Sequence, residues 1–308
     1  MATTTSITTT YAGEFAGKYI AAALLSGTTL EKGLISIKPN VKYKEVIKKI
    51  ATDDIVKNGT CDFDPTSTLT LTERVLQTEE FQVNLQLCKK DFRTDWEAVQ
   101  MGYSVYDNLP PSFTDFLLAH VAEQVAQRIE TNIWAGVNAT AGQFDGFTTL
   151  FAADASVIDV TGTSVTAANV IAEMGALVDA IPAVLYGKED LTIYVPQNVA
   201  KAYVRALGGF GAAGVGAQGM DNKGTMWYGS QDLYFDGIRV AMVNGLPSNK
   251  MVAAQSSNLY FGTGLFSDHN EVKVLDMGDL DGSQNVRVIM RFTAGLQYGI
   301  GSEVVYYA

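Results

Sequence analysis

The stretch "LYFDGIRVAMVNGLPSNKMVAAQSSNLYFG", residues 233–262, holds most of the information about the architecture of this chain. Short runs of Val, Ala, Leu, Tyr and Phe alternate there with turn residues such as Gly245 and Pro247. Apolar runs of about four to eight residues between turn residues are typical of buried strands. The pattern continues to the C-terminus in "EVKVLDM", "NVRVIMRFTAGLQYGI" and "EVVYYA", and Asp281-Gly282 stands between the first two as a hairpin turn would. We therefore predict that the C-terminal third consists of strands.

The middle of the chain predicts helices. "PPSFTDFLLAHVAEQVAQRIETNIWAGV" carries an apolar residue at every fourth position from Phe113 to Val137, which is the spacing of one helix face. We expect one long helix over Ser112–Val137, a rod of roughly 37 Å. A shorter helix is expected in "VTAANVIAEMGALVDAIP", and "LTIYVPQNVAKAYVRAL" predicts a buried strand, Leu191–Val195, followed by a helix that starts at a proline. Together these elements indicate an α+β fold.

The sequence pattern of residues 33–91 predicts strands, but the segment has too few apolar residues in layers to form a core of its own. "TLTLTERVLQ" alternates, with Leu69 and Leu71 on one face, and "FQVNLQL" alternates again. Asn58-Gly59 is a strong turn signal between the strand-like runs. An isolated hairpin is only marginally stable in water. We therefore expect this excursion to pack on something else, which includes another subunit.

A glycine-rich stretch from Gly208 to Gly224 contains the G-x-G-x-x-G spacing of dinucleotide-binding proteins twice. The first match uses Gly209, Gly211 and Gly214, and the second uses Gly214, Gly216 and Gly219. That fingerprint requires a strand before the glycines and a helix after them, because the N-terminus of the helix receives the pyrophosphate. Here the glycines follow a predicted helix and lead into "MDNKGTMWYGSQ", which has no helical periodicity. We interpret the stretch as a permissive loop and expect no cofactor.

Composition excludes several classes of protein. The 308 residues include 22 Lys plus Arg and 33 Asp plus Glu, a net charge of −11, and an acidic chain repels the phosphates of nucleic acid. Two cysteines, Cys61 and Cys88, are too few for a disulfide framework, so we expect reduced thiols. The most apolar N-terminal stretch, Tyr19–Leu25, is too short to span a bilayer. We expect no membrane contact and a protein that is soluble and intracellular when made.

The residues that commonly carry catalysis form no recognisable constellation. His120 and His269 are the two histidines, and neither has a nucleophile and an acid nearby in the sequence. The aspartates of "DMGDLDGSQN", which include Asp281, do not meet the EF-hand pattern, because Val288 stands where the calcium-binding Glu would be. We expect no metal site and no enzyme. The residues alone indicate a structural or assembly protein whose extensions are completed by its neighbours.

In this order the elements resemble the major capsid proteins of tailed phages, the family named for the HK97 fold. The resemblance covers nearly the whole chain and is most specific over residues 233–307. There an apolar strand with a glycine is followed by a short apolar strand, "LYFG" and two long strands, with Arg291 before the last apolar stretch. "LTIYVPQNVAKAYVRAL" is similar to the strand and helix of the family, in which a proline commonly follows the strand.

The resemblance implies a division of the chain into an arm, an extended loop and two domains. It implies an N-terminal arm at 1–32, an extended loop (the E-loop) with flanking strands at 33–85, a peripheral domain with a long spine helix and a sheet at 86–151 and 265–295, and an axial α/β domain at 152–264 and 296–308. The arm and the E-loop would lie on neighbouring subunits, and the glycine loop would face the centre of a pentamer or hexamer.

These segments contain the residues that we expect at contacts between subunits. They are Lys44, Lys48, Lys57, Asn58 and Gly59 in the E-loop, Gly209, Gly211, Gly214 and Gly216 in the glycine loop, and Asp281 in the last hairpin.

The resemblance also implies a function. Copies of the chain would form the hexamers and pentamers of an icosahedral head that encloses double-stranded DNA without sequence-specific binding. The protein would be made in the host cytoplasm and located in the virion. A portal protein would be one partner, and a separate scaffolding protein and a decoration protein are left open. The alternative is an encapsulin-type shell protein of a bacterial compartment, which has the same fold.

Overall fold

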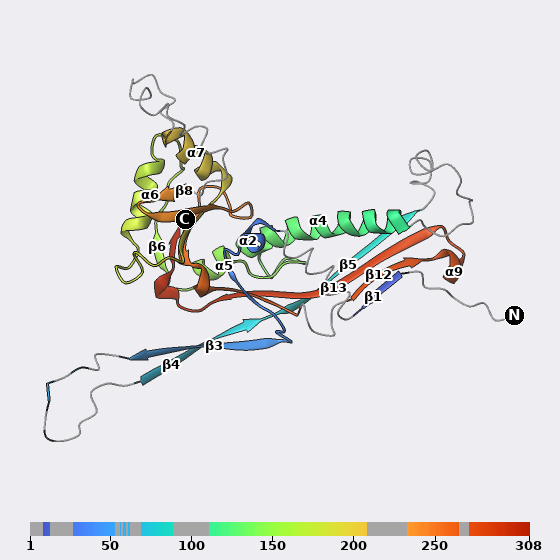
Figure 1. The fold of residues 1–308 in the computed structure, drawn as a ribbon, viewed down its shortest axis with the longest axis horizontal. Helices are drawn as coiled ribbons and strands as arrows, with labels where there is room; N and C mark the ends of the chain where they lie inside the picture. Colours follow the sequence, from blue (N-terminus) through green and yellow to red (C-terminus); the bar gives the residue numbers. More distant parts are fainter. Residues whose placement is uncertain are drawn as a thin grey trace.

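The computed structural model describes residues 9–12, 27–52, 56, 58–59, 61, 69–88, 111–207, 233–264 and 271–308. This part of the chain forms two lobes and a projecting hairpin (Figure 1). An elongated lobe contains the longest helix and the longest strands, and a compact lobe contains the C-terminus. The hairpin extends away from both lobes near their junction. The architecture is α+β, as predicted.

A six-stranded mixed sheet forms the elongated lobe. Its order is β1-β12-β13-β11-β2, and β5 pairs with β13 outside this path. The strands span Thr9–Ala12 (β1), Ser36–Lys38 (β2), Glu79–Cys88 (β5), Leu259–Thr263 (β11), Glu271–Asp276 (β12) and Asn285–Tyr298 (β13). Because β13 is long, its first part pairs with β5 and β12 and its last part pairs with β11. This one strand therefore runs the length of the lobe.

The long helix α4 (Pro111–Ala135) lies along this sheet (Figure 1). Its buried apolar side chains repeat at helical spacing and include Leu118, Val121, Val125, Ile129 and Ile133. The predicted helix is confirmed, but it ends two residues early, and Val137 beyond its end is 41% exposed. Neither α4 nor any other helix in the described ranges is long and apolar enough to cross a membrane.

The compact lobe contains the second six-stranded sheet, in the order β6-β14-β10-β7-β9-β8. Its strands span Ile158–Val160 (β6), Leu191–Val195 (β7), Leu233–Phe235 (β8), Ile238–Met242 (β9), Met251–Gln255 (β10) and Val305–Tyr307 (β14). Two helices, α6 (Val170–Asp179) and α7 (Gln197–Leu207), share one apolar core with this sheet. The predicted strand and helix at 191–207 are thus confirmed.

The two lobes share a core through the compact sheet. Alternate residues of β7 face opposite sides: Ile193 packs in the core with α6 and α7, whereas Tyr194 packs in the core of the elongated lobe. In β10, Ala253 packs in the core with α6 and α7, and Val252 packs in the core of the elongated lobe. Every residue of β7 and β10 is buried as a result, which explains why these strands read as continuous apolar runs. The lobes are joined by packed apolar surface rather than by a linker.

The last hairpin joins β12 and β13, as predicted, but its turn is larger than two residues. A short helical turn, α9 (Gly278–Asp281), makes the connection. It is closed by Gly282, whose φ of 72° lies in the left-handed region that glycine adopts without strain. Asp281 is exposed at this end of the elongated lobe.

We predict that Trp134→Ala destabilises both lobes together. The Trp134 ring is fully buried, with its centroid 5.5 Å from that of Phe147 and 5.1 Å from that of Tyr194 in the compact lobe. Removal of such a ring costs about 3–5 kcal/mol of unfolding free energy. The control Val137→Ala removes an exposed side chain and should change it by less than about 0.5 kcal/mol. Urea denaturation measures both, and equal effects of the two substitutions would contradict this assignment.

Candidate inter-subunit surfaces

The projecting hairpin consists of β3 (Lys44–Thr52) and β4 (Leu69–Gln77), which among the described strands pair only with each other. Register partners in an antiparallel pair lie on the same face, so Val46 with Val75 and Ile50 with Leu71 share one face. We define the apolar hairpin face as Val46, Ile50, Leu69, Leu71 and Val75. These side chains are 41–64% exposed. The alternation predicted for "TLTLTERVLQ" is confirmed, but its apolar side faces away from the core of this chain.

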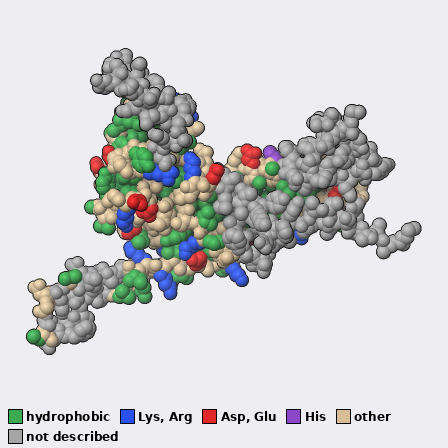
Figure 2. All heavy atoms as spheres, in the orientation of Figure 1, with side chains coloured by type: hydrophobic (Ala, Val, Ile, Leu, Met, Phe, Trp, Pro, Cys, Tyr) green, Lys and Arg blue, Asp and Glu red, His purple; other side chains and the backbone are tan. Residues whose placement is uncertain are grey.

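The hairpin also carries positive charge on an acidic chain. β3 contains three lysines and one glutamate, whereas the whole chain has a net charge of −11. Lys44 and Lys48 are exposed on the same side as the apolar hairpin face, because their register partners are Gln77 and Glu73. Figure 2 shows apolar and basic side chains side by side over the described part of the hairpin.

The other face of the hairpin packs on the elongated lobe at a pair of glycines. Gly262 of β11 and Gly295 of β13 are register partners. A Cβ at Gly295 would lie 2.1 Å from the carbonyl oxygen of Gln77, and one at Gly262 would lie 2.8 Å from Cδ2 of Leu76. Leu76 is fully buried there. Only two adjacent residues without side chains let the hairpin backbone approach the sheet this closely.

An ionic cluster lies beside this glycine pair. The Arg74 guanidinium forms an ion pair with Asp154 and stacks over the Tyr298 ring, 4.2 Å from its centroid. The Tyr298 hydroxyl donates to Oδ2 of Asp154 at 2.6 Å, and the Ser156 backbone N–H donates to Oδ1 at 2.8 Å. The Tyr298 hydroxyl, with these other donors, holds the pKa of the Asp154 carboxyl well below its usual range. Burial, together with the bond to Asp154, raises the pKa of Tyr298.

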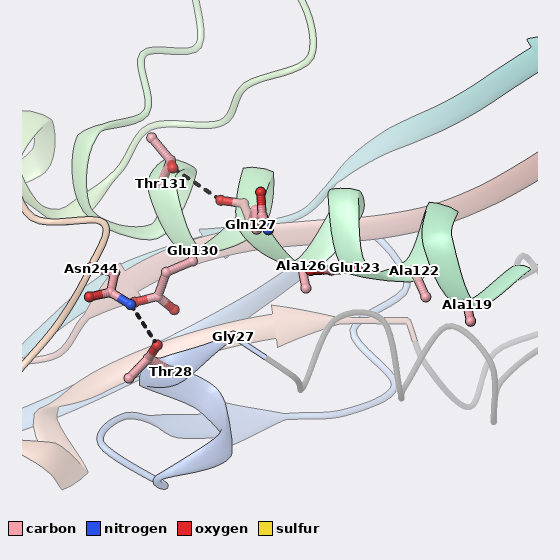
Figure 3. Close-up of a pocket in the computed structure, with 10 residues that line it drawn as sticks. All are labelled: Gly27, Thr28, Ala119, Ala122, Glu123, Ala126, Gln127, Glu130, Thr131 and Asn244. Atoms are coloured by element: carbon pink, nitrogen blue, oxygen red, sulfur yellow. Dashed lines mark hydrogen bonds between the residues drawn. The ribbon is translucent and has the colours of Figure 1, made fainter. Parts of the chain in front are cut away.

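A cavity of about 640 Å³ lies between α4 and the segment that contains Gly27 and Thr28 (Figure 3). Next to it, Glu130 is 5% exposed and accepts hydrogen bonds from the Thr29 backbone N–H at 3.0 Å and from the Thr29 hydroxyl at 2.5 Å. Trp134 Nε1 donates to the same hydroxyl at 2.9 Å. Asn244 donates to Thr28 across the cavity at 3.2 Å. These bonds hold α2 (Thr28–Glu31) against α4.

The structure separates the residues predicted at subunit contacts. Lys44 and Lys48 lie on the hairpin, Asn58 and Gly59 are exposed beyond the end of β3, and Asp281 lies in α9 at the far end of the elongated lobe. The rest lie outside the described residues: Lys57, Gly209, Gly211, Gly214 and Gly216. In the described ranges, no three side chains of the kinds that bind metals come together.

Sequence analysis missed the groups that hold the hairpin in place. Arg74 and Asp154 are 80 positions apart in the sequence, and Gly262 and Gly295 are 33 positions apart. Nothing in the local pattern links either pair. The one usable signal was a glycine inside each of two apolar strand runs, which indicates close approach of another backbone.

The overall fold of this chain is similar to that of chains in solved capsids. A chain of the satellite phage P4 procapsid that includes the size determination protein is 13% identical, with a TM-score of 0.56 over 94% of this chain and 96% of that chain. A chain from the capsid of Myoviridae phage XM1 is 11% identical, with a TM-score of 0.57 over 91% of each chain. A chain from the capsid of a native GTA particle is 13% identical, with a TM-score of 0.57 over 92% of this chain and 97% of that chain.

These likenesses define the class of fold: the chain has the phage capsid fold. This is the fold that the resemblance to the HK97-fold family predicts. At 11–13% identity the agreement lies in the arrangement of elements along nearly the whole chain. No protein-family model matches the sequence, and no curated protein matches it.

We expect Gly295→Ala to lower the free energy of unfolding by disturbing the packing of the hairpin on the elongated lobe. Its methyl group would overlap the Gln77 carbonyl oxygen, and overpacking of this kind costs about 1–3 kcal/mol. The matched control is Gly175→Ala in α6, where a Cβ meets open space, and the better helix propensity of Ala should raise stability by roughly 0.4–1 kcal/mol. Urea midpoints that move in the same direction for both variants would contradict the close approach at Gly295.

The Asp154 carboxylate predicts a loss of stability in acid. Because its pKa is lower in the folded chain than in the unfolded one, its contribution is complete above the unfolded value of about 3.9 and is lost as pH falls toward the folded value. The difference in unfolding free energy between the natural chain and Asp154→Asn should therefore be constant from about pH 7 to 5 and shrink below about pH 4. Denaturation curves across this range measure it, and a difference that does not change with pH would show that the ion pair contributes nothing.

Proposed function

We propose that this chain is the major capsid protein of a tailed double-stranded DNA phage. Its copies form hexamers and pentamers of an icosahedral head that encloses the genome. Its role in this proposal is structural and requires no catalytic residue. The capsid fold supports the proposal, and the observation that carries it within the chain is the apolar hairpin face.

The apolar hairpin face needs a partner outside this chain. Five Val, Ile and Leu side chains lie on one side of a two-stranded hairpin and are 41–64% exposed. Complete burial of such a side chain contributes about 1.5–3 kcal/mol, and a two-stranded hairpin has no second layer with which to achieve it. A second copy of the chain, repeated around a ring, supplies this cover for every hairpin at once.

The charge distribution suits a container for DNA. A net charge of −11 keeps packed DNA from adhering to the wall of the shell, so the genome is held without sequence-specific binding. Lys44 and Lys48, which share a side with the apolar hairpin face, oppose this balance locally, which favours contact between this side of the hairpin and the acidic body of another copy. The head would be assembled in the host cytoplasm and would become part of the virion.

The remaining segments have roles by the same proposal. Residues 1–32 form the arm and 33–85 the E-loop with its flanking strands. The peripheral domain consists of 86–151 and 265–295, and the axial domain of 152–264 and 296–308. The glycine loop lines the centre of each ring, a portal protein occupies one vertex, and scaffolding and decoration proteins are candidate further partners.

We predict that Ile50→Ser/Leu71→Ser gives a folded subunit that does not form shells. The two residues are register partners at the centre of the apolar hairpin face, so the change removes apolar contact surface without touching either core. Thr70→Ser/Thr72→Ser is the matched control, because both threonines are exposed on the opposite face of β4. Negative-stain electron microscopy of particles and circular dichroism of subunits give the two readouts.

Closed shells from the natural chain and from the control, but not from the serine pair, support the proposal. Shells of normal yield from the serine pair would show that the apolar hairpin face is not an assembly surface. Small discrete oligomers of the natural chain, with and without an adjacent scaffold gene, would refute the capsid function. The contents of particles isolated from cells separate the alternatives: DNA supports a phage head, whereas an enclosed enzyme without DNA would assign the shell to a bacterial compartment.

A further inference from the structure

We propose that Arg74, Asp154 and Tyr298 act as positioning residues that fix the angle at which the hairpin leaves the body. We call these three residues the hairpin clamp. The clamp itself is a property of the single chain. Its consequence for assembly rests on the function proposed above, because the fixed angle presents the apolar hairpin face to the next copy in one orientation.

The hairpin clamp joins three parts of the chain that are far apart in sequence. Arg74 belongs to β4 of the hairpin, Asp154 follows α5 (Phe147–Ala152), and Tyr298 is the last residue of β13. Tyr298 is 1% exposed, and its ring lies edge-on to Phe151 of α5, with centroids 5.1 Å apart. The surface that receives Arg74 is therefore part of the core shared by the two lobes.

The chemistry of the contact restricts rotation as well as distance. A guanidinium that both stacks on a ring and pairs with a carboxylate is held in one plane. Arg74 does both at once: it is 4.2 Å above the Tyr298 ring and is paired with Asp154, whose other donors hold the carboxylate still. A lysine would keep the charge and lose the planar stacking.

Arg74 contacts the body at a point on β4 that is further from the root of the hairpin than the other described contacts. Closer to the body, the Gln297 side chain donates to the Val75 carbonyl at 3.1 Å, and Leu76 packs against Gly262. Of the described hydrogen bonds between β4 and the body, those of Arg74 are the furthest out along the strand. The contacts of Val75 and Leu76 fix the position of the root of the hairpin. The contact of Arg74, further out along β4, fixes the direction in which the hairpin extends.

The first test measures the angle in the free subunit. In a full-length Cys61→Ser/Cys88→Ser background, spin labels at Thr72→Cys on the hairpin and Lys201→Cys on α7 report the distance between hairpin and compact lobe. Both sites are exposed. We expect one narrow distance distribution for the natural clamp. Arg74→Gln, Asp154→Asn and Tyr298→Phe should each lose that narrow peak and broaden the distribution.

Controls separate loss of the clamp from loss of charge or fold. Lys49→Gln removes a positive charge from the same hairpin without touching Asp154 and should keep the narrow peak. Tyr298→Phe keeps the buried ring and removes only the donor to Asp154, so it provides a variant that folds even if Arg74→Gln does not. Arg74→Lys should give an intermediate width. Distributions that are equally narrow in all clamp variants would overturn the proposal.

Particle formation then tests the consequence for assembly. Where the natural chain and Lys49→Gln close shells, the clamp variants should give fewer or irregular particles. Regular shells at full yield from variants with broadened distributions would overturn the link between angle and assembly. If the natural chain forms no particles, the proposed function fails, and the distance measurement still decides whether the clamp exists.

Discussion

A two-stranded hairpin has two faces and can cover neither by itself, and this constraint organises the molecule. One face of β3–β4 is satisfied at its root by the elongated lobe, where Leu76 fits over Gly262 and the Gln77 backbone crosses Gly295. The other face carries five exposed apolar side chains, and in the proposed function a second copy covers it. The anchored face and the exposed face depend on each other. If this chain covered both faces, no apolar surface would remain for a partner, and if it anchored neither, the hairpin would have no defined direction.

The two lobes of the body that holds the hairpin share packed surface. Trp134 of the long helix contacts Tyr194 of the compact sheet and also donates to Thr29 of α2. Phe151 bridges Tyr298 and Tyr306 in the same way. Close-packed interiors transmit displacement rather than absorb it. Through Tyr298, Arg74 of the hairpin is therefore in contact with the core that the two lobes share.

Much of the fold could be predicted from local pattern, because strands and helices imprint their periods on the sequence. The apolar run at 191–195 and the four-residue spacing of α4 predicted elements that the structure confirms within a few residues. Periodicity shows which residues share a face of a strand but not what covers that face. The alternation around Leu69 and Leu71 therefore predicted an apolar face, but it did not predict that this face is exposed. The Arg74–Asp154 pair and the Gly262–Gly295 pair depend on chain crossings far apart in sequence, which no local window contains. The predictions at Lys57 and the glycine loop lie outside the described residues and stay predictions.

The capsid fold is shared here at only 11–13% identity. Buried strands tolerate exchange among Val, Ile, Leu and Ala as long as volume and period are kept, so the cores place few demands on individual residues. Substitutions are tolerated less well where two backbones cross or where a charge is partly buried. At Gly295 an added methyl group would overlap the Gln77 carbonyl, and at Asp154 loss of the carboxylate would leave Arg74 without its partner. The root of the hairpin combines both conditions. In the proposed assembly, the geometry between neighbouring copies is therefore set at the point where the chain has least freedom to vary, whereas the exposed hairpin face needs only to stay apolar.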